Sequence, residues 1–463
     1  MEKNEIFTAV CEALGSNGEG IVRKDGVTYF VPFLLAGERA RIRVLKQKGR
    51  IGYGKIEELV TPAEERVRPK CPVFGRCGGC RLQHLRYRDQ LKFKTALVRD
   101  TLRKIGGVEF PVNDCERSDR EYGYRNKLQL PIGRRNGENA IGFYAERSHR
   151  IVKTDCCPIH PDWSEALIKS LYTFMETCGL EGYDDETGEG QLRHIVVREL
   201  KGKFLVTLVS AVPEIKGIDY LLFLLDSVFP EYSFYLNYNE KRTNVVFGEQ
   251  FTLLKGKGLY ECTENGVTFE AGASTFVQVN EGVRGKLYER ALSLVDAGET
   301  VIDCYAGGGL LTAMFAKKCG KAYGIEIVPE ASACADRVKE CNGLAESMTN
   351  VCGRVEDYLG EILSREPNAT VVLDPPRAGA DRNVLREIIA RKIKKVIMIS
   401  CDPATLARDL GILTGGLTET AGGELIKSDP ANGSYALTLI QPFDMFPQTR
   451  HTETLACLVR KAD

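Results

Sequence analysis

Cys401 has the sequence context of a nucleophile. It follows the apolar run KKVIMIS and precedes Asp402 and Pro403, which are typical of a helix N-cap and of the first helical position. Because a helix N-terminus stabilises a thiolate, we expect the pKa of Cys401 to be lowered. A thiolate can add to C6 of a uracil ring, and this addition makes C5 reactive toward a methyl sulfonium.

Addition at C6 leaves a proton on C5 that a base must remove. The candidates lie in the segment DMFPQTRHTE, residues 444–453. Glu453 is the carboxylate that we expect to act as the base. His451 is the alternative, either as the base or as a residue that orders the loop. Taken alone, Glu453 would be interpreted as an exposed acid on a terminal strand, so its catalytic role depends on Cys401.

A glycine turn in VIDCYAGGGLLT, residues 301–312, predicts a ligand at a helix N-terminus. Gly307 and Gly309 fit the dinucleotide pattern Gly-x-Gly-x-x-Gly, but Thr312 stands where the third glycine would be. Glu326 ends the next apolar run and is placed to accept hydrogen bonds from ribose hydroxyls. The pattern therefore fits S-adenosylmethionine better than NAD, since S-adenosylmethionine has no pyrophosphate to bind.

Asp374 begins the motif Asp-Pro-Pro-Arg directly after the apolar run ATVVL. Two prolines after a strand fix an extended exit at the carboxyl edge of a sheet, where ligands bind in open α/β folds. Enzymes that methylate exocyclic amines usually have an aromatic residue after this motif, whereas this chain has Arg377. Arg377 thus argues against methylation of nitrogen and leaves methylation of carbon open.

A separate group of cysteines has the spacing of a metal site. Cys71, Cys77 and Cys80 follow the pattern Cys-x5-Cys-x2-Cys, and Cys156 and Cys157 lie further along in TDCCPIHP. In a reducing compartment such thiols stay free, bind metal or catalyse. Spacing alone does not separate zinc from an iron–sulfur cluster.

The elements that must position these residues are visible as alternating patterns. Strand and helix patterns alternate over residues 271–463, which predicts a doubly wound, Rossmann-like α/β domain. Residues 63–270 indicate a central α+β domain, and we expect its helix at about 86–106 to pack on the C-terminal domain. Residues 1–62 indicate a small OB-like β-barrel.

Charge and composition limit the class of partner. The net charge is zero, but the run from Arg39 to Lys55 holds seven basic residues and no acidic residue. Alternation in RARIRV turns its arginines to one face, which favours a phosphate-binding surface for RNA or DNA. The charged N-terminus and the lack of a long apolar run predict a cytoplasmic protein without a membrane partner.

Together these motifs resemble the RNA uracil-C5 methyltransferases over nearly the whole chain. The resemblance rests on FVQVN at 276–280, DCYAGGG at 303–309, DPPRAG at 374–379, SCDPATLARD at 400–409 and DMFPQTRHTE at 444–453. It implies S-adenosylmethionine-dependent methylation at C5 of uridine in RNA, through a covalent bond from Cys401 to C6. It also implies Glu453 as the base. The residues implied around the methyl donor are Gln278, Tyr305, Glu326 and Asp374.

The N-terminal barrel, with its GSNGEGI turn, resembles the RNA-binding TRAM domain. The ribosomal branch of the family carries a [4Fe-4S] cluster on the same cysteine pattern, with the distant ligand directly before proline. This resemblance implies Cys71, Cys77, Cys80 and Cys157 as ligands. It also implies 23S rRNA as the substrate, because tRNA specialists of the family typically lack both barrel and cluster. We expect a monomer whose partner is RNA and not DNA.

Alternatives of other classes share part of this pattern. tRNA uridine-C5 methylation would use the same catalytic residues. A radical-S-adenosylmethionine enzyme also combines a TRAM barrel with a cluster, but it normally shows Cys-x3-Cys-x2-Cys instead of the spacing found here. A non-catalytic RNA-binding protein would keep barrel and cluster without needing Cys401 and Glu453 together.

Overall fold

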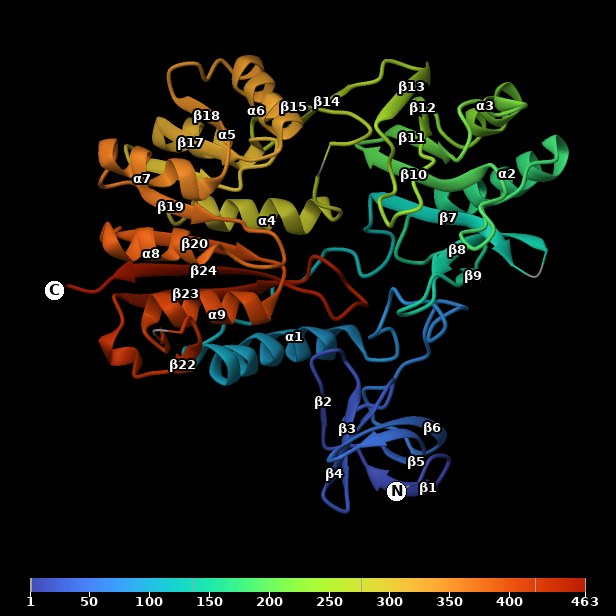
Figure 1. Ribbon diagram of the computed structural model, residues 1–463, viewed down its shortest axis with the longest axis horizontal. Helices are drawn as coiled ribbons and strands as arrows, with labels where there is room; N and C mark the ends of the chain where they lie inside the picture. The colour runs from blue at the N-terminus through green and yellow to red at the C-terminus, as the bar shows by residue number, and fades with distance from the viewer. Residues whose placement is uncertain (1, 136, 276, 421, 463) are drawn as a thin grey trace.

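The computed structural model describes residues 2–135, 137–275, 277–420 and 422–462. Within these residues the chain forms an N-terminal, a central and a C-terminal block, each built around its own sheet (Figure 1). Phe276, the first residue of the FVQVN motif, lies outside the described residues. In the described ranges, none of the helices combines the length and the apolar character needed to cross a lipid bilayer.

The N-terminal block is a sheet of strand order β1-β5-β6-β4-β3-β2, drawn in blue in Figure 1. Its strands are β1 Ile6–Val10, β2 Ala13–Leu14, β3 Gly20–Lys24, β4 Val27–Val31, β5 Arg39–Lys48 and β6 Ile51–Thr61. Ala40, Ile42 and Val44 of β5 are buried in the core of this block, and Arg39 and Arg41 between them are exposed. The predicted alternation along β5 is confirmed.

The central block is a mixed sheet of strand order β13-β12-β11-β10-β7-β8-β9. Its strands are β7 Lys127–Arg135, β8 Glu138–Tyr144, β9 Ile151–Lys153, β10 Leu192–Leu200, β11 Lys203–Ser210, β12 Tyr232–Tyr238 and β13 Gln250–Lys255. Helices α2, Trp163–Cys178, and α3, Ile218–Asp226, cover it. Leu167, Leu171 and Phe174 of α2 recur at helical spacing and share one core with the strands.

The C-terminal block is a sheet of strand order β18-β17-β16-β19-β20-β24-β23, parallel except for the antiparallel strands β24 and β23. Its strands are β16 Thr300–Cys304, β17 Lys321–Glu326, β18 Met348–Cys352, β19 Thr370–Leu373, β20 Lys395–Ser400, β23 Tyr435–Phe443 and β24 Glu453–Arg460. Its helices are α4 Glu281–Leu292, α5 Leu310–Cys319, α6 Pro329–Cys341, α7 Val355–Arg365, α8 Arg382–Ala390 and α9 Pro403–Thr414.

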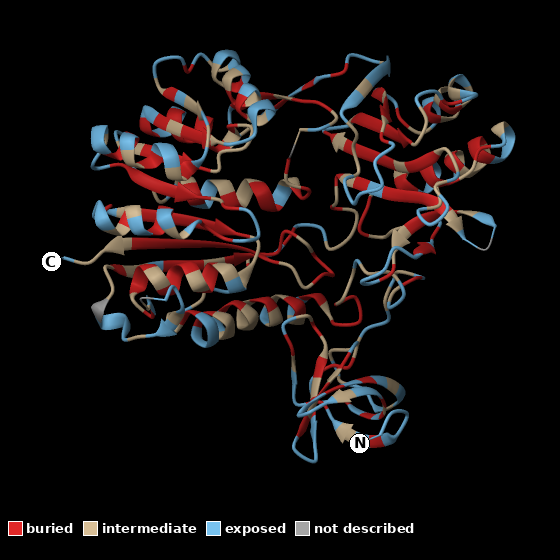
Figure 2. Cartoon of the chain, viewed as in Figure 1, coloured by how far each residue is buried: buried red, intermediate tan, exposed pale blue. Residues whose placement is uncertain are grey.

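Both faces of this sheet are buried, as Figure 2 shows along its strands. Val301 and Val372 belong to the core on one face, whereas Ile302 and Val371, their neighbours in sequence, belong to the core on the other. A sheet buried on both faces by helices is the doubly wound arrangement. The α/β fold predicted from the alternating pattern is confirmed. Beyond α9, a hairpin of β21 Leu417–Glu419 and β22 Leu425–Lys427 and a 3-10 turn, Pro430–Asn432, lead to β23.

Segments that precede residue 271 also pack on the C-terminal block. Val98 of α1, Tyr87–Thr101, lies in the same core as the strands, and a π-helical turn, Leu102–Gly106, continues α1 along α9. A Cβ on Gly106 would lie 2.3 Å from the carbonyl oxygen of Ala407, so the close approach to α9 requires glycine. The hairpin of β14, Tyr260–Glu264, and β15, Val267–Ala271, packs in the core on the other face.

Candidate active site

The predicted site residues gather at one edge of the C-terminal sheet. Strand order reverses between β16 and β19, which is the topological switch point where ligands bind in such sheets. Tyr305 follows β16, Asp374 follows β19 and Cys401 follows β20. Glu326 is the last residue of β17, and Glu453 is the first residue of the antiparallel strand β24. The topology therefore places all of these residues where the parallel strands end.

Cys401 lies at the turn from β20 into α9. Asp402 caps the helix, because its Oδ1 accepts hydrogen bonds from the backbone N–H groups of Ala404 at 2.8 Å and Thr405 at 3.1 Å. This cap fixes the backbone of Cys401, which is half-buried. The sequence predicts this geometry, and the structure has it.

The electrostatic surroundings of Cys401 differ from the expectation. Burial raises the pKa of its thiol, and the charges of Glu453 and Asp374 raise it further, while Arg377 lowers it. The predicted lowering of this pKa by the helix terminus is therefore wrong. Burial and neighbouring carboxylates outweigh a partial helix charge.

Glu453 lies opposite Cys401 across β20 and β24. Ser400 pairs with Thr454 at the end of this antiparallel register, so Cys401 and Glu453 come next on the two strands, and the charge of Glu453 acts on the Cys401 thiol. Glu453 is buried, with 3% of its surface exposed. Burial and, to a smaller extent, the charge of Asp374 raise the pKa of Glu453 to about 8. A carboxylate with this pKa is a much stronger base than an ordinary glutamate and suits proton abstraction near neutral pH.

His451, the alternative base, is in a different electrostatic state. Burial and the positive charges of Arg450 and Arg377 lower the pKa of His451 to about 4. Its ring packs edge-on against Phe446, with 6.1 Å between ring centroids. A histidine with this pKa binds a proton weakly at pH 7, so the geometry favours the loop-ordering role over the role of base.

The glycine turn after β16 leaves space for a ligand. Gly307 and Gly309 have φ angles of 55° and 75°. A Cβ on Gly309 would lie 2.5 Å from the Cβ of Ala335, whereas a Cβ on Gly307 would meet no atom within 4 Å. Glu326 accepts a hydrogen bond from the backbone N–H of Gly307 at 2.8 Å, which brings its carboxylate to this open side. An open glycine loop beside a strand-end acid fits the ribose end of S-adenosylmethionine.

Thr312 and Asp303 form a buried pair beneath the glycine turn. Thr312 donates a hydrogen bond from Oγ1 to Oδ2 of Asp303 at 2.6 Å, so the residue that interrupts the glycine fingerprint supports the turn. Burial raises the pKa of Asp303 to about 7, and the charges of Asp374 and Glu326 add to this rise. Sequence reasoning missed Asp303. Its signal is a carboxylate inside an otherwise apolar strand, directly before the turn.

Tyr305 and Gln278 each lie in a loop. Tyr305 has a φ angle of 66°, an uncommon conformation for a residue with a side chain, and its hydroxyl accepts a hydrogen bond from the backbone N–H of Asp381 at 3.4 Å. Gln278 lies on the loop before α4, where its carbonyl accepts from Arg284 at 3.2 Å. α4 reaches the site through Tyr288, whose pKa is raised by burial and by the charge of Asp374.

The base loop, residues 444–452, is held by segments from the first half of the chain. The carbonyl of Gln448 accepts hydrogen bonds from the backbone N–H groups of Arg81 at 3.1 Å and Leu82 at 2.9 Å. Gln90 of α1 donates from Nε2 to Oε1 of Gln448 at 3.0 Å, and the backbone N–H of Gln448 donates to Oε1 of Gln90 at 3.0 Å. Gln448 is buried and has a φ angle of 71°.

A buried ion pair adds to this attachment. Lys94 of α1 is fully buried, pairs with Asp444, and donates a hydrogen bond to the carbonyl of Phe446 at 3.0 Å. The hydroxyl of Tyr124 donates to the carbonyl of Pro447 at 3.0 Å. The position of the candidate base therefore depends on α1 and on residues 81–124 as well as on the C-terminal sheet.

The cysteines expected to bind metal interact with one another. Burial raises the pKa of Cys80 to about 12. Burial also raises the pKa of Cys157, and the neighbouring sulfurs of Cys80, Cys71 and Cys77 raise it further. The pKa of Cys156 is raised by burial and then by Glu165 and Cys71. Of the neighbours Cys156 and Cys157, only Cys157 has a pKa that responds to all three upstream cysteines.

In the described ranges, no group of three or more Cys, His, Asp or Glu side chains is placed so that it could hold a metal ion. In a [4Fe-4S] cluster each iron takes one cysteine sulfur, so the ligands surround several metals instead of converging on one. The expectation of a cluster therefore rests on the number and spacing of Cys71, Cys77, Cys80 and Cys157 in the sequence.

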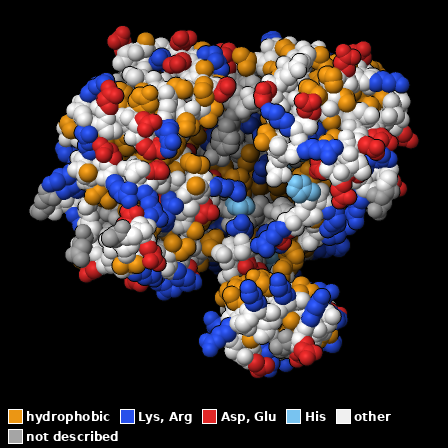
Figure 3. Space-filling model, in the orientation of Figure 1, with side chains coloured by type: hydrophobic (Ala, Val, Ile, Leu, Met, Phe, Trp, Pro, Cys, Tyr) orange, Lys and Arg blue, Asp and Glu red, His pale blue; other side chains and the backbone are white. Residues whose placement is uncertain are grey.

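Positive charge is distributed differently from the sequence-based expectation. On β5, Arg41 pairs with Glu58 at 2.9 Å, and Arg43 forms a bidentate pair with Glu57, with both N–O distances 2.8 Å. The outer face of the basic run is therefore partly neutralised by β6. Figure 3 shows Lys and Arg side chains also gathered around the hollow between the blocks.

The chain is similar to known RNA methyltransferases. Residues 257–461 match the tRNA (Uracil-5-)-methyltransferase family. An uncharacterised RNA methyltransferase of Halalkalibacterium halodurans is 36% identical over 468 residues, which cover 100% of this chain and 98% of that protein. An uncharacterised RNA methyltransferase of Listeria monocytogenes is 35% identical over 463 residues, which cover 99% of this chain and 98% of that protein.

The fold is also similar to a solved structure over its whole length. The crystal structure of Pyrococcus abyssi tRNA (uracil-54, C5)-methyltransferase in complex with S-adenosyl-L-homocysteine matches with a TM-score of 0.73 and 26% sequence identity. The match covers 98% of this chain and 99% of that chain. The likeness therefore extends through the N-terminal, central and C-terminal blocks.

Proposed function

Because the chain belongs to the RNA uracil-5-methyltransferase family of S-adenosylmethionine-dependent enzymes, we propose that it methylates C5 of uridine in 23S rRNA through a covalent bond from Cys401. The observation that carries this proposal is the register of β20 and β24, which sets Cys401 opposite a buried Glu453. Family membership leaves no support for the radical-S-adenosylmethionine and non-catalytic alternatives.

In this proposal, S-adenosylmethionine binds where the parallel strands of the C-terminal sheet end. S-adenosylmethionine, when bound, supplies an electrophilic methyl group there. Glu326 accepts hydrogen bonds from the ribose hydroxyls, and the open side of Gly307 faces the ligand. Gln278, Tyr305 and Asp374 complete the surroundings of the methyl donor.

In the proposed reaction, Cys401 forms the covalent bond to the base and Glu453 removes the proton. Sγ of Cys401, once deprotonated, bonds to C6, and the electrons of the C5=C6 bond make C5 a nucleophile. C5 takes the methyl group as the methyl–sulfur bond breaks, and S-adenosylhomocysteine leaves. Glu453 then accepts the C5 proton, the electrons of that C–H bond restore C5=C6, and the bond from Cys401 breaks. Arg377 lowers the pKa of both groups and so favours their reactive forms.

The rest of the chain has supporting roles in this proposal. Cys71, Cys77, Cys80 and Cys157 hold a [4Fe-4S] cluster, which is structural because every iron has its own cysteine ligand. Residues 1–62 form a TRAM-like RNA-binding domain, residues 63–270 the cluster domain and residues 271–463 the catalytic domain. The protein works as a monomer in the cytoplasm.

tRNA is the second candidate substrate, and one observation favours it. The Pyrococcus abyssi enzyme, named for uracil 54 of tRNA, matches 98% of this chain. The presence of an N-terminal block therefore does not separate rRNA enzymes from tRNA enzymes. The preference for 23S rRNA depends on the cysteine pattern, which resembles that of the ribosomal branch.

Methyl transfer to defined RNAs tests the proposed substrate. The purified protein and methyl-tritiated S-adenosylmethionine are incubated separately with unmethylated 23S rRNA and with unmodified tRNA transcripts, and the labelled nucleoside is identified after digestion. We expect 5-methyluridine in 23S rRNA. Label in tRNA alone would assign the protein to tRNA, and label in neither RNA would contradict the proposed function.

A further inference from the structure

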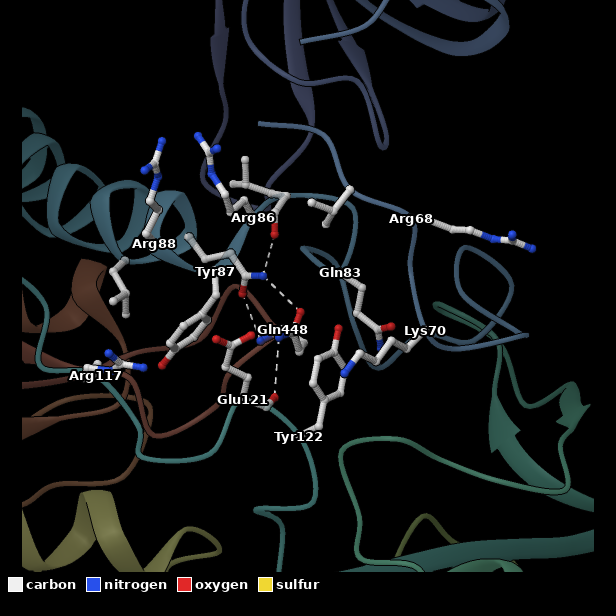
Figure 4. A pocket seen from close by; sticks show the side chains of 14 residues that line it. Arg68, Lys70, Gln83, Arg86, Tyr87, Arg88, Arg117, Glu121, Tyr122 and Gln448 are labelled. Carbon is white, nitrogen blue, oxygen red and sulfur yellow. Dashed lines mark hydrogen bonds between the residues drawn. The ribbon is translucent and has the colours of Figure 1, made fainter. Parts of the chain in front are cut away.

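A basic pocket of about 470 Å³ lies between α1, the base loop and the cysteine segment, residues 71–85 (Figure 4). Arg86, Arg88 and Arg117 lie on one side of this pocket, and Arg68 and Lys70 lie on the opposite side. Its volume is within the range of about 300–1,000 Å³ that is usual for ligand sites. The catalytic mechanism above uses none of these residues.

Positive charge in the basic pocket exceeds negative charge, because its lining holds the cations Arg68, Lys70, Arg86, Arg88 and Arg117 beside one carboxylate, Glu121. Asp89 is shared by Arg86 at 2.8 Å, Arg88 at 3.4 Å and Lys92 at 2.8 Å. Arg68 and Arg117 are exposed and form no ion pair in the part of the chain that the structure describes. An anion in the pocket would therefore meet cations that have no carboxylate partner of their own.

The wall of the basic pocket also carries an aromatic side chain. Nζ of Lys70 lies 4.4 Å from the ring centroid of Tyr122. Cations beside an aromatic ring are the combination with which proteins bind single-stranded nucleic acid.

Three buried glutamines, Gln83, Gln90 and Gln448, line the basic pocket and connect it to the rest of the site. Gln448 of the base loop forms part of the wall, and Gln90 fixes its side chain. Gln83 forms another part, and its Oε1 accepts a hydrogen bond from the backbone N–H of Cys71 at 3.1 Å. A ligand in the pocket is thus held against the loop that continues directly to Glu453.

We propose that the basic pocket binds the phosphodiester backbone of the substrate RNA at a nucleotide that flanks the target uridine. The proposal rests on the proposed function, because it takes the substrate to be RNA. Cations on both sides allow a single strand to pass between them, and phosphate contacts fix its register. A target base must leave its stack to reach Cys401, and a backbone held beside the base loop would present it there.

The double variant Arg68→Ala with Arg117→Ala tests this assignment. Its substrate is total RNA from cells that lack the gene, and the measured quantities are kcat, KM for RNA, KM for S-adenosylmethionine and RNA binding against salt. We expect KM for RNA to rise about tenfold or more, with KM for S-adenosylmethionine unchanged. The plot of log binding constant against log salt concentration should become less steep by about 1.4, because each of the two lost phosphate contacts to a single strand contributes about 0.7 to its slope.

The matched control removes the same charge elsewhere. Arg365→Ala with Arg386→Ala, on α7 and α8, should leave KM for RNA and the salt slope unchanged. Replacement of Arg68 and Arg117 by lysine should restore most of the binding, because a phosphate contact needs only a cation.

Arg88→Ala is a second variant that is expected to fold normally, because this side chain is 64% exposed. It should raise KM for RNA by itself. If the wild-type enzyme methylates RNA and the pocket variants have the same KM for RNA and the same salt slope as the wild type, the assignment of the pocket is overturned. A wild-type enzyme that methylates no RNA would contradict the proposed function instead.

Discussion

At the residue scale, the reactive side chains are buried or half-buried in surroundings that favour their uncharged forms. Burial raises the pKa of Cys401, of Glu453 to about 8 and of Asp374 to about 7. Carboxyl groups close together and away from water resist ionisation. Cys401 and Glu453 must each lose a proton before they act, so the chemistry is linked to pH and to stability.

The dependence of kcat/KM on pH should report the ionisation of Glu453. Since Glu453 acts as a base with a pKa of about 8 in the free enzyme, kcat/KM should rise between pH 7 and pH 9. His451→Gln should keep this profile, because the pKa of His451 is about 4. Loss of the rise in His451→Gln, or a rate that falls from pH 7 to pH 9, would argue against Glu453 as the base.

Glu453→Gln should stabilise the protein at alkaline pH. The folded state keeps the proton of Glu453 up to about pH 8, whereas the unfolded chain releases it near 4.5, so this group's contribution to stability is lost as pH rises through that window. Thermal unfolding at pH 5 and pH 8.5 measures the effect. The variant should gain stability relative to wild type at pH 8.5 but not at pH 5, and the exposed control Glu424→Gln should change neither. An equal effect at both pH values would contradict a raised pKa.

The identities of the candidate catalytic residues could be inferred from sequence, but their electrostatic states could not. Cys401 and Glu453 each sit in a distinctive local motif, and a cap such as Asp402 is local too. The pKa of Cys401 depends on burial and on carboxylates from other strands, so local reasoning from the helix terminus gave the wrong direction. Asp303 was missed because its role depends on a hydrogen bond from Thr312 on the next helix.

At the element scale, α1 is the part of the chain that fixes the base loop. Gln90 and Lys94 lie one helical turn apart on α1 and contact Gln448, Asp444 and Phe446. Gln90 and Gln448 are 358 positions apart in sequence. A helical pattern predicted α1, but a contact across this separation leaves no local signal in a single sequence.

Lys94→Met should destabilise the protein far more than Lys92→Met. Removing Lys94 leaves the carboxylate of Asp444 buried without its cation, which should lower the free energy of unfolding by about 3–5 kcal/mol. Lys92 is 74% exposed, so its loss should change this free energy by about 1 kcal/mol or less. Denaturant unfolding of both variants measures the difference, and equal stabilities would contradict the buried attachment of the base loop.

At the scale of the whole molecule, the cysteine segment and the catalytic sheet are joined through the base loop. The backbone of Arg81 and Leu82, directly after Cys80, donates to the carbonyl of Gln448. A cluster bound by Cys80 would therefore stiffen the segment that holds the base. The division into three blocks follows the composition of the sequence, but this junction between blocks is a product of tertiary structure.

Replacement of single cysteines tests the proposed cluster. Anaerobically purified wild-type protein should contain about four iron and four sulfide per chain. Cys157→Ser should lose iron and sulfide, whereas the neighbouring control Cys156→Ser should keep them, because Cys157 interacts with all three upstream sulfurs. Zinc without sulfide in the wild type, or the reverse result for the two variants, would contradict the assignment.

The covalent intermediate is the most direct test of the account. Glu453→Gln should still allow addition and methyl transfer, but removal of the C5 proton should slow, since a general base contributes about a hundred- to ten-thousand-fold. With methyl-tritiated S-adenosylmethionine and RNA, label should then run with the protein band in denaturing electrophoresis. Cys401→Ala should give neither labelled protein nor methylated RNA, although it still binds S-adenosylmethionine. Normal turnover by Glu453→Gln, or methylation by Cys401→Ala, would contradict the proposed mechanism.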